Sequence, residues 1–433
     1  MSTPPRQLTN PFYVLLSLPS TAMGFALCVQ ISALSWILST KYDLSIEHVG
    51  LVWLAGPLAG LLAQPIVGLI SDKVWFWGGR RRPFILIGGV TASLMLLALP
   101  FLGEISRLSG VEILWTAVAV ALTLDLAINV GFNPTRSIIA DLTPEGEART
   151  KGFTWMQTIS GLFGVLAYVI GAVFGNYALI YVGVGLVLLF NVVPAMFLRE
   201  PRHLGTAAED SGQSAVESPG RTNHPRLIHI YLAHSFTWLG VQTMFVFMFA
   251  YAQHAFFPGV TELAEEQKNG LGQIISISLL IMNIVGFIFP VAVLQPLARR
   301  IGLVRTHTIS IFIMAAGYGG IVLVGGQGAA VLYALMAVVG IGWAAVVSLP
   351  FAIMSDSVDK TRMGLFMGIF NLSVVIPQII VSIGIGKVVG AAADKNIVFI
   401  ICAASLAISA VLWALLREDK SEPGTIAMGG GSH

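Results

Sequence analysis

Charged residues are scarce in this chain: Asp, Glu, Lys and Arg make up 11% of its 433 residues. Soluble globular proteins carry about 25%. Hydrophobic residues reach 56%, and the mean hydropathy is +0.82. This leaves too little polar surface to face water, which excludes a soluble enzyme, a nucleic-acid-binding protein and a disordered scaffold. The composition indicates a polytopic membrane protein instead.

Cysteine is almost absent as well. Cys28 and Cys402 both lie in apolar stretches, so we expect no disulfide framework. The sequence lacks the GxxxxGK[ST] phosphate loop, HExxH, CxxC and Cys/His clusters that indicate ATP hydrolysis or a metal site. It also lacks a repeat typical of a selectivity filter. We therefore expect no cofactor and no direct use of ATP.

Long apolar segments recur along the chain, separated by short polar stretches. A helix that crosses the roughly 30 Å hydrocarbon layer needs about 20 apolar residues. The 46 Gly and 20 Pro residues suit transmembrane helices that pack closely and bend. We expect twelve spans, near 12–39, 48–71, 83–103, 112–140, 152–175, 177–198, 227–256, 271–296, 304–325, 329–355, 362–388 and 396–416.

One long polar interval, 199–226, is rich in Ser, Gly, Pro and charge, and is typical of a flexible linker. It divides the chain into two six-helix bundles, 1–198 and 227–420. A tail follows at 421–433, and its closing GGGSH is typical of an expression-tag remnant. The predicted fold class is an all-α membrane protein with two pseudo-symmetric bundles.

The basic residues predict the orientation. Eighteen of the 24 Lys and Arg residues fall on one side of these spans, five on the other, and one inside a span. Because cytoplasmic loops gather Lys and Arg, both termini are predicted to be cytoplasmic. We expect a multi-pass protein of the cell inner membrane that functions as a monomer and binds no nucleic acid.

The two halves repeat a motif. The exits of the fourth and tenth spans align at an offset of about 215 residues, with Pro134, Asp141, Arg149 and Gly152 matching Pro350, Asp356, Arg362 and Gly364. Two homologous six-helix halves are typical of alternating-access transporters.

The loop after the second span contains Gly68 and Asp72, followed by Gly79 and an arginine cluster at 80–82. This pattern is similar to the signature loop of the major facilitator superfamily. Its arginines can pair with carboxylates of the next loop and latch the cytoplasmic side. The alternative is that they only obey the positive-inside rule. We assign gating to the charged residues at these exits: Asp72, Arg81, Arg82, Asp141, Arg149, Asp356 and Arg362.

The fourth span contains two charges. Asp125 is the acidic residue placed well inside an apolar segment, and Arg136 is the cation so placed. An ionised side chain at mid-bilayer costs at least about 2.5–3.5 kcal/mol, so it indicates function. Helical geometry puts the two about 20° apart in azimuth but roughly 16 Å apart along the axis. Asn129 shares their face. The alternative is that each charge pairs with another helix and only fixes packing.

Other polar and aromatic residues inside the spans suit a sugar, because amides bond hydroxyls and rings stack on apolar sugar faces. For any single one of them, interhelical hydrogen bonding or packing is the more common role, and they indicate binding more strongly as a set. Besides Asp125, Asn129 and Arg136, the candidates for substrate binding are Gln30, Gln64, Trp238, Gln242 and Asn371. His48, His234 and His254 are secondary candidates for a proton relay.

Three blocks resemble a known family. The run Val52–Ile85, the pattern Asp125-Leu-Ala-Ile-Asn129 with Pro134 and Arg136, and the run Ser348–Gln378 are similar to plant sucrose transporters. Those proteins belong to the glycoside–pentoside–hexuronide cation symporter group of the major facilitator superfamily. The resemblance implies proton-coupled uptake of sucrose or a related disaccharide or glucoside. It implies that Asp125 binds the proton and that Arg136 is its electrostatic partner.

We therefore predict a proton–sugar symporter, not an enzyme, with the sugar and the proton as ligands in a lipid bilayer. Two other transport modes stay open: a sugar facilitator, and a proton-antiport exporter of sugars or amphipathic compounds. A membrane sugar sensor is the alternative of another class, against which the short cytoplasmic loops argue.

Overall fold

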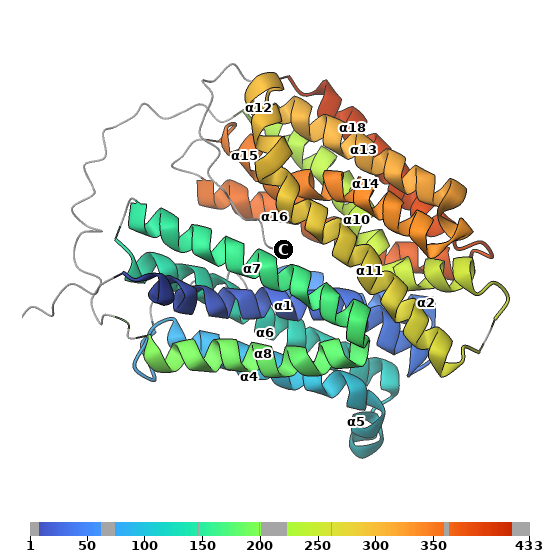
Figure 1. The fold of residues 1–433 in the computed structure, drawn as a ribbon, viewed down its shortest axis with the longest axis horizontal. Helices are drawn as coiled ribbons and strands as arrows, with labels where there is room; N and C mark the ends of the chain where they lie inside the picture. The colour runs from blue at the N-terminus through green and yellow to red at the C-terminus, as the bar shows by residue number, and fades with distance from the viewer. Residues whose placement is uncertain are drawn as a thin grey trace, which may run out of the picture. The chain divides into compact units, whose positions relative to one another are not determined.

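The structure is a computed structural model that describes residues 8–61, 74–144, 147–198, 200, 223–260, 262–358 and 363–417. These residues are nearly all helical and contain no named strand (Figure 1). Eleven of their helices are long and apolar enough to cross a membrane. A shorter apolar helix at Ile46–Leu61 lies where the second span is expected, and the rest of that span falls outside the described residues.

The helices of the first half overlap the predicted spans, and the second span is described only as far as residue 61. They are α1 (Asn10–Thr40), α2 (Ile46–Trp53), α4 (Arg82–Ala98), α5 (Leu102–Ser109), α6 (Ile113–Leu142), α7 (Glu147–Phe174) and α8 (Asn176–Phe197). The short helix η1 (Leu99–Phe101) joins α4 to α5.

The helices of the second half are more often interrupted. They are α10 (His224–Phe256), α11 (Glu265–Phe289), α12 (Gln295–Ile301), α13 (Leu303–Val324), α14 (Ala329–Ser348), α15 (Pro350–Ser355), α16 (Met363–Ile380), α17 (Gly386–Ala391) and α18 (Ile397–Leu415). Two π-helical turns, η3 (Pro290–Leu294) and η6 (Val381–Ile385), join α11 to α12 and α16 to α17, and η4 (Gly325–Gln327) ends α13.

The chain forms two compact units. Unit 1 contains 1–30, 58–167 and 177–214, and unit 2 contains 31–57, 168–176 and 215–433. The boundary between them passes through α1, between Gln30 and Ile31. The second unit therefore includes the C-terminal end of α1 and all of α2.

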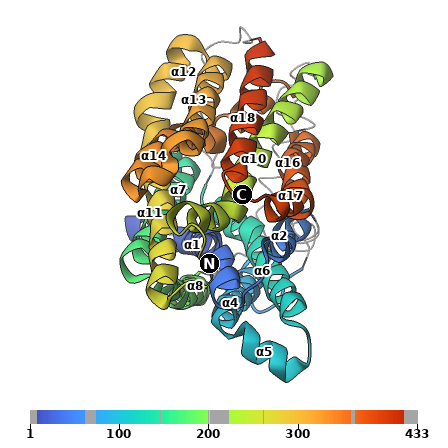
Figure 2. The ribbon, with the colours of Figure 1, turned by 90° about the vertical axis from the view of Figure 1, so that its right-hand side faces the viewer.

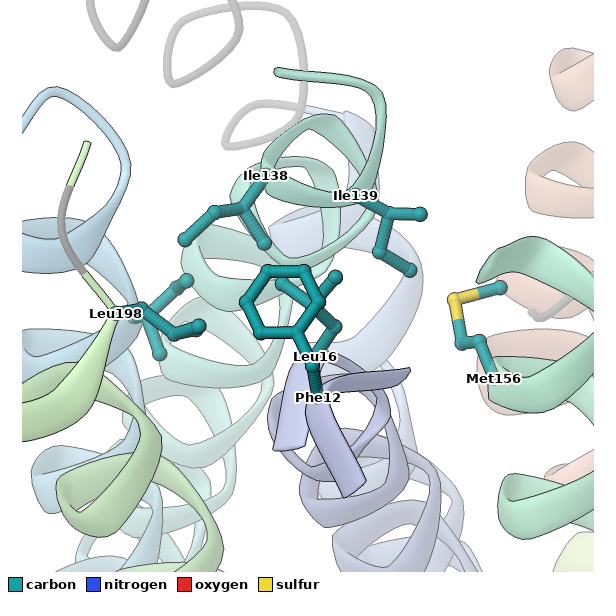
Figure 3. Packing of buried hydrophobic residues seen from close by; sticks show 7 residues of the cluster. Phe12, Leu16, Ile138, Ile139, Met156 and Leu198 are labelled. Atoms are coloured by element: carbon teal, nitrogen blue, oxygen red, sulfur yellow. The ribbon is translucent and has the colours of Figure 1, made fainter. Parts of the chain in front are cut away.

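Small residues let the helices of unit 1 approach closely. A Cβ atom at Gly88 of α4 would lie 2.7 Å from the carbonyl oxygen of Ala127 in α6, so only glycine fits there. Ser93 of α4 donates to the carbonyl of Val184 in α8 at 2.7 Å. At one end, an apolar cluster of Phe12, Leu16, Ile85, Ile138, Ile139, Met156 and Leu198 fills the unit (Figure 3). This packing holds α6, the helix that carries Asp125, against its neighbours.

Unit 2 packs around α18, which contacts both α10 and α13 (Figure 2). Buried hydroxyls join these helices: Thr237 of α10 and Ser409 of α18 lie 2.7 Å apart, and Ser409 also donates to the carbonyl of Ala233. Because lipid gives helices little hydrophobic reason to associate, such interhelical bonds and close contacts specify the packing.

Candidate functional site

Asp125 lies near the middle of α6 and is 5% exposed. Its Oδ2 accepts a hydrogen bond from Nε2 of Gln30 in α1 at 3.0 Å, and Gln30 is itself buried. The side-chain partner is therefore a neutral amide. An amide can bond a carboxylate as a donor or a protonated carboxyl as an acceptor, so this environment suits a group that gains and loses a proton. Both residues are candidates for substrate binding by sequence, and the structure brings them together.

Asn129 and Arg136 follow Asp125 along α6. The side-chain amide of Asn129 donates to the backbone carbonyl of Asp125 at 2.8 Å, which holds it one turn away on the same helix face. The guanidinium carbon of Arg136 lies 5.4 Å from the centre of the Phe132 ring, in a cation–π arrangement. Helix α6 continues without a break from Asp125 through Pro134 to Arg136, so the two charges are separated by three turns.

A second polar cluster lies in unit 2, on one face of α10. Trp238 and Gln242 are buried and one helical turn apart. Gln378 of α16 donates to the side-chain oxygen of Gln242 at 3.3 Å. The bonded pair of amides still has further donors and acceptors for hydroxyl groups. None of these three side chains carries a formal charge.

Trp343 of α14 joins this cluster, although it is not among the residues predicted from the sequence. Its ring lies edge-on to Trp238, with centroids 6.3 Å apart, and edge-on to Phe245, at 5.6 Å. The Trp343 ring packs against α11 at Gly286, which has no side chain. A Cβ atom at this position would lie 2.7 Å from Cδ1 of Trp343. The half-buried indole is more exposed than that of Trp238. A lone Trp in an apolar span has no local pattern to distinguish it, since its neighbours come from other helices.

The arginine cluster at the start of α4 binds Asp141 at the end of α6. Nη2 of Arg80 and Nε of Arg81 lie 3.0 Å and 3.2 Å from the same carboxylate oxygen. Both residues are mostly buried, which shields the pair from solvent. Arg82 donates to the carbonyl of Gly78 instead. The predicted contact between this loop and a carboxylate of the neighbouring helix exit is therefore present for Asp141.

Glu200, the second residue of the predicted linker, contributes a contact that the sequence pattern does not indicate. Its carboxylate accepts from the backbone N–H groups of Arg80, Arg81 and Arg82, at 2.8, 2.9 and 2.7 Å. It thereby caps the N-terminus of α4, where unpaired N–H groups attract an anion. The preceding turn has Trp77 and Gly78 at positive φ, and Gly79 leaves room for the carboxylate.

The remaining gating candidates make separate contacts. Arg149 donates to the carbonyls of Ala140 and Thr143 at the C-terminal end of α6. Asp356 is exposed at the end of α15, where its backbone N–H bonds to Ala352. Asn371 is half-buried on α16. Gln64, Asp72 and Arg362 lie outside the described residues.

Unit 2 also contains a buried group of three small polar residues. The hydroxyls of Ser32 in α1 and Ser276 in α11 lie 2.9 Å apart and share a hydrogen bond, and each lies within hydrogen-bonding distance of Oδ1 of Asn176, at 3.3 and 3.2 Å. Nearby, the indole of Trp36 donates to the carbonyl of Lys268 at 2.8 Å. These bonds fix the C-terminal part of α1 to α11, and the sequence offers no spacing signal for them.

Comparisons with known proteins agree with this architecture. The sucrose transport protein SUC4 of Arabidopsis thaliana is 26% identical over 443 aligned positions, which cover 89% of this chain and 85% of that protein. The general alpha-glucoside permease of Schizosaccharomyces pombe is 30% identical over 174 positions, or 36% of this chain and 31% of the permease. The predicted resemblance to plant sucrose transporters is therefore confirmed.

Solved structures give the same fold. The nucleoside transporter NupG superimposes with a TM-score of 0.70 at 14% sequence identity, covering 93% of this chain and 98% of that one. At such identity the likeness concerns the fold alone. The family model described as Major Facilitator Superfamily matches residues 16–382. With its eleven described membrane-spanning helices, this multi-pass membrane protein belongs to the Major Facilitator Superfamily.

Proposed function

We propose that this protein is a proton-coupled symporter that imports sucrose or a related disaccharide or glucoside by alternating access. The observation that carries the proposal is the buried carboxylate of Asp125, whose side-chain partner is the neutral amide of Gln30 at 3.0 Å. A buried ionisable residue in a membrane span is costly and marks a pathway or a proton relay. The names of the plant relatives support a sugar as the substrate.

In this mechanism a proton from outside neutralises Asp125. The resulting carboxyl O–H can donate to a sugar hydroxyl, while Asn129 and Arg136 offer further donors on the same helix. The amides of Gln242 and Asn371 and the ring of Trp238 complete the proposed recognition of the sugar. Once the loaded site is open to the cytoplasm, the proton leaves and the sugar loses a hydrogen bond. Release of both ligands then follows.

In this proposal the proton gradient supplies the free energy for uphill uptake of the sugar. One proton that moves down a potential of 100 mV supplies about 2.3 kcal/mol, which supports roughly a fiftyfold accumulation of a neutral sugar. We assign the contacts of Arg80 and Arg81 with Asp141 to a cytoplasmic latch. In the same proposal both termini are cytoplasmic, the protein lies in the inner membrane, and one chain suffices for transport.

The deciding experiment measures external pH while sugars are added to de-energised cells or proteoliposomes that contain the protein. We expect alkalinisation on addition of sucrose, maltose or another glucoside, because each sugar carries a proton inward. Empty vesicles and a non-glycosidic polyol serve as controls. Uptake of labelled sugar without any pH change would refute proton coupling and favour a facilitator. Absence of both signals across the panel would refute sugar transport.

A further inference from the structure

His234 of α10 makes a contact that determines its protonation state. Its side chain is 1% exposed, and its Nε2 accepts a hydrogen bond from Nε1 of Trp238 at 3.0 Å. An indole N–H can only donate, so Nε2 of His234 must carry a lone pair and not a proton. The imidazole in this arrangement is therefore neutral, with its proton on Nδ1.

The same imidazole is held from a second side. Its ring stacks on Phe370 of α16, with centroids 4.6 Å apart and planes 13° apart. Trp238 in turn meets Trp343 of α14 at 77°. Four rings from three helices thus form a row in which His234 supplies the hydrogen bond that orients Trp238.

Protonation of His234 would break this arrangement. An imidazolium carries N–H groups on both nitrogens, so a donor would face the donor of Trp238. The added charge would also be buried, because the side chain of His234 is 1% exposed. Phe370 faces the ring from α16, and Trp343 of α14 contacts Trp238. Ser409 of α18 bonds to the carbonyl of Ala233, the residue before His234. Among the described residues, Tyr231 is a titratable side chain that contacts Phe370.

We propose that His234 is a positioning residue that holds Trp238 and Trp343 in their binding arrangement only while its imidazole is neutral. This adds a second pH-dependent element to the molecule, in unit 2, and it acts on affinity and not on coupling. The assignment of a sugar as the ligand rests on the proposed function. The dependence of the Trp238 orientation on His234 is independent of the proposed function.

The first test needs no ligand. Tryptophan fluorescence of the purified full-length protein is titrated between about pH 8 and 4.5, the range in which histidine gains its proton. Because the chain has nine Trp residues, the titration is repeated with Trp238→Phe and the two curves are subtracted. We expect a pH-dependent change in the difference curve, which is absent in His234→Gln because a glutamine oxygen accepts the indole N–H at every pH. A pH-dependent change that persists in His234→Gln would overturn the proposal.

The second test measures sugar binding in an Asp125→Asn background, which removes the other proposed titrating group. With His234 intact, affinity should fall about tenfold on acidification; with His234→Gln, it should stay constant and match the high-pH value within about twofold. His234→Phe, which keeps a ring but no acceptor, should bind weakly at all pH values. Equal pH profiles for His and Gln, or equal loss in the Gln and Phe variants, would refute the role.

The two proposals can fail separately. If no sugar binds at any pH but the fluorescence change disappears in His234→Gln, the proposed substrate is wrong and the positioning role stands. If sugar uptake alkalinises the medium but fluorescence and affinity do not depend on residue 234, the transport proposal stands and the inference on His234 fails. Elution as a monodisperse peak from size-exclusion chromatography shows that each variant is folded.

Discussion

The polar clusters of the two units differ in charge. In unit 1, α6 carries Asp125 and Arg136, three turns apart. In unit 2, the corresponding cluster consists of indoles and amides, Trp238, Gln242, Trp343 and Gln378, with no charge among them. The helix exits of the two halves still share a motif in sequence. The two halves therefore share a motif at their helix exits but differ in their membrane-embedded polar residues, which are a carboxylate and a guanidinium in one half and neutral indoles and amides in the other.

The largest effect is expected from Asp125→Asn. This substitution should abolish proton coupling and leave the movement of sugar through the protein in place. Uphill accumulation, about fiftyfold at 100 mV, should fall to simple equilibration because the amide cannot carry a proton. Sugar counterflow should continue, since unit 2 is unchanged. The matched control is Glu112→Gln, an exposed acidic residue just before α6. Accumulation at the wild-type level in Asp125→Asn would exclude this residue from coupling.

The converse substitution is Trp343→Ala in unit 2. Loss of the indole should weaken the apparent sugar affinity about tenfold, because aromatic contacts contribute about 0.5–1.5 kcal/mol beyond burial. The number of protons per sugar should not change. Trp115→Ala, at an exposed position of α6, is the control. A changed proton-to-sugar ratio, measured by pH electrode and labelled uptake together, would show that the two functions are not divided between the units.

A smaller effect is expected from Glu200→Gln, which leaves both clusters intact. The substitution removes the negative charge that accepts three backbone N–H bonds at the start of α4. Charge-assisted bonds contribute about 1.5–3 kcal/mol each, but the amide keeps one acceptor, so we expect a loss of about 1–3 kcal/mol and a Tm lower by several degrees. Glu104→Gln, exposed on α5, is the control. An unchanged Tm would show that the cap does not stabilise unit 1.

The smallest effect concerns Asp394, an exposed residue before α18. The backbone N–H of Asn396, which donates to its Oδ1 at 2.9 Å, and His254, 3.1 Å away, lower the pKa of Asp394. Because the folded pKa lies below that of the unfolded chain, its contribution is complete above about pH 4 and is lost as the pH falls through the folded pKa. Asp394→Asn should therefore lower Tm by less than about 1 °C at pH 7, and the difference should vanish in strong acid. A difference that grows on acidification would contradict this sign.

The sequence predicted the spans well because a membrane helix must satisfy its backbone internally and present about 20 apolar residues, which hydropathy reveals directly. Asp125 was found for the same reason, since a charge in such a segment is conspicuous. Trp343, Glu200 and the bond between Ser32 and Ser276 were not found, because their partners come from distant segments. Local spacing contains no information on which residue of another helix lies opposite.

Helix α1 belongs to both units, because the boundary between them falls within it. Gln30 holds Asp125 in unit 1, and Ser32, two residues later, bonds to Ser276 in unit 2. On an α-helix these positions are about 3 Å apart along the axis and point about 200° away from each other. The helix continues through both without interruption. Because the two contacts share one uninterrupted helix, a break in α1 near residue 31 would remove the covalent continuity between the residue that bonds Asp125 and the residue that bonds Ser276.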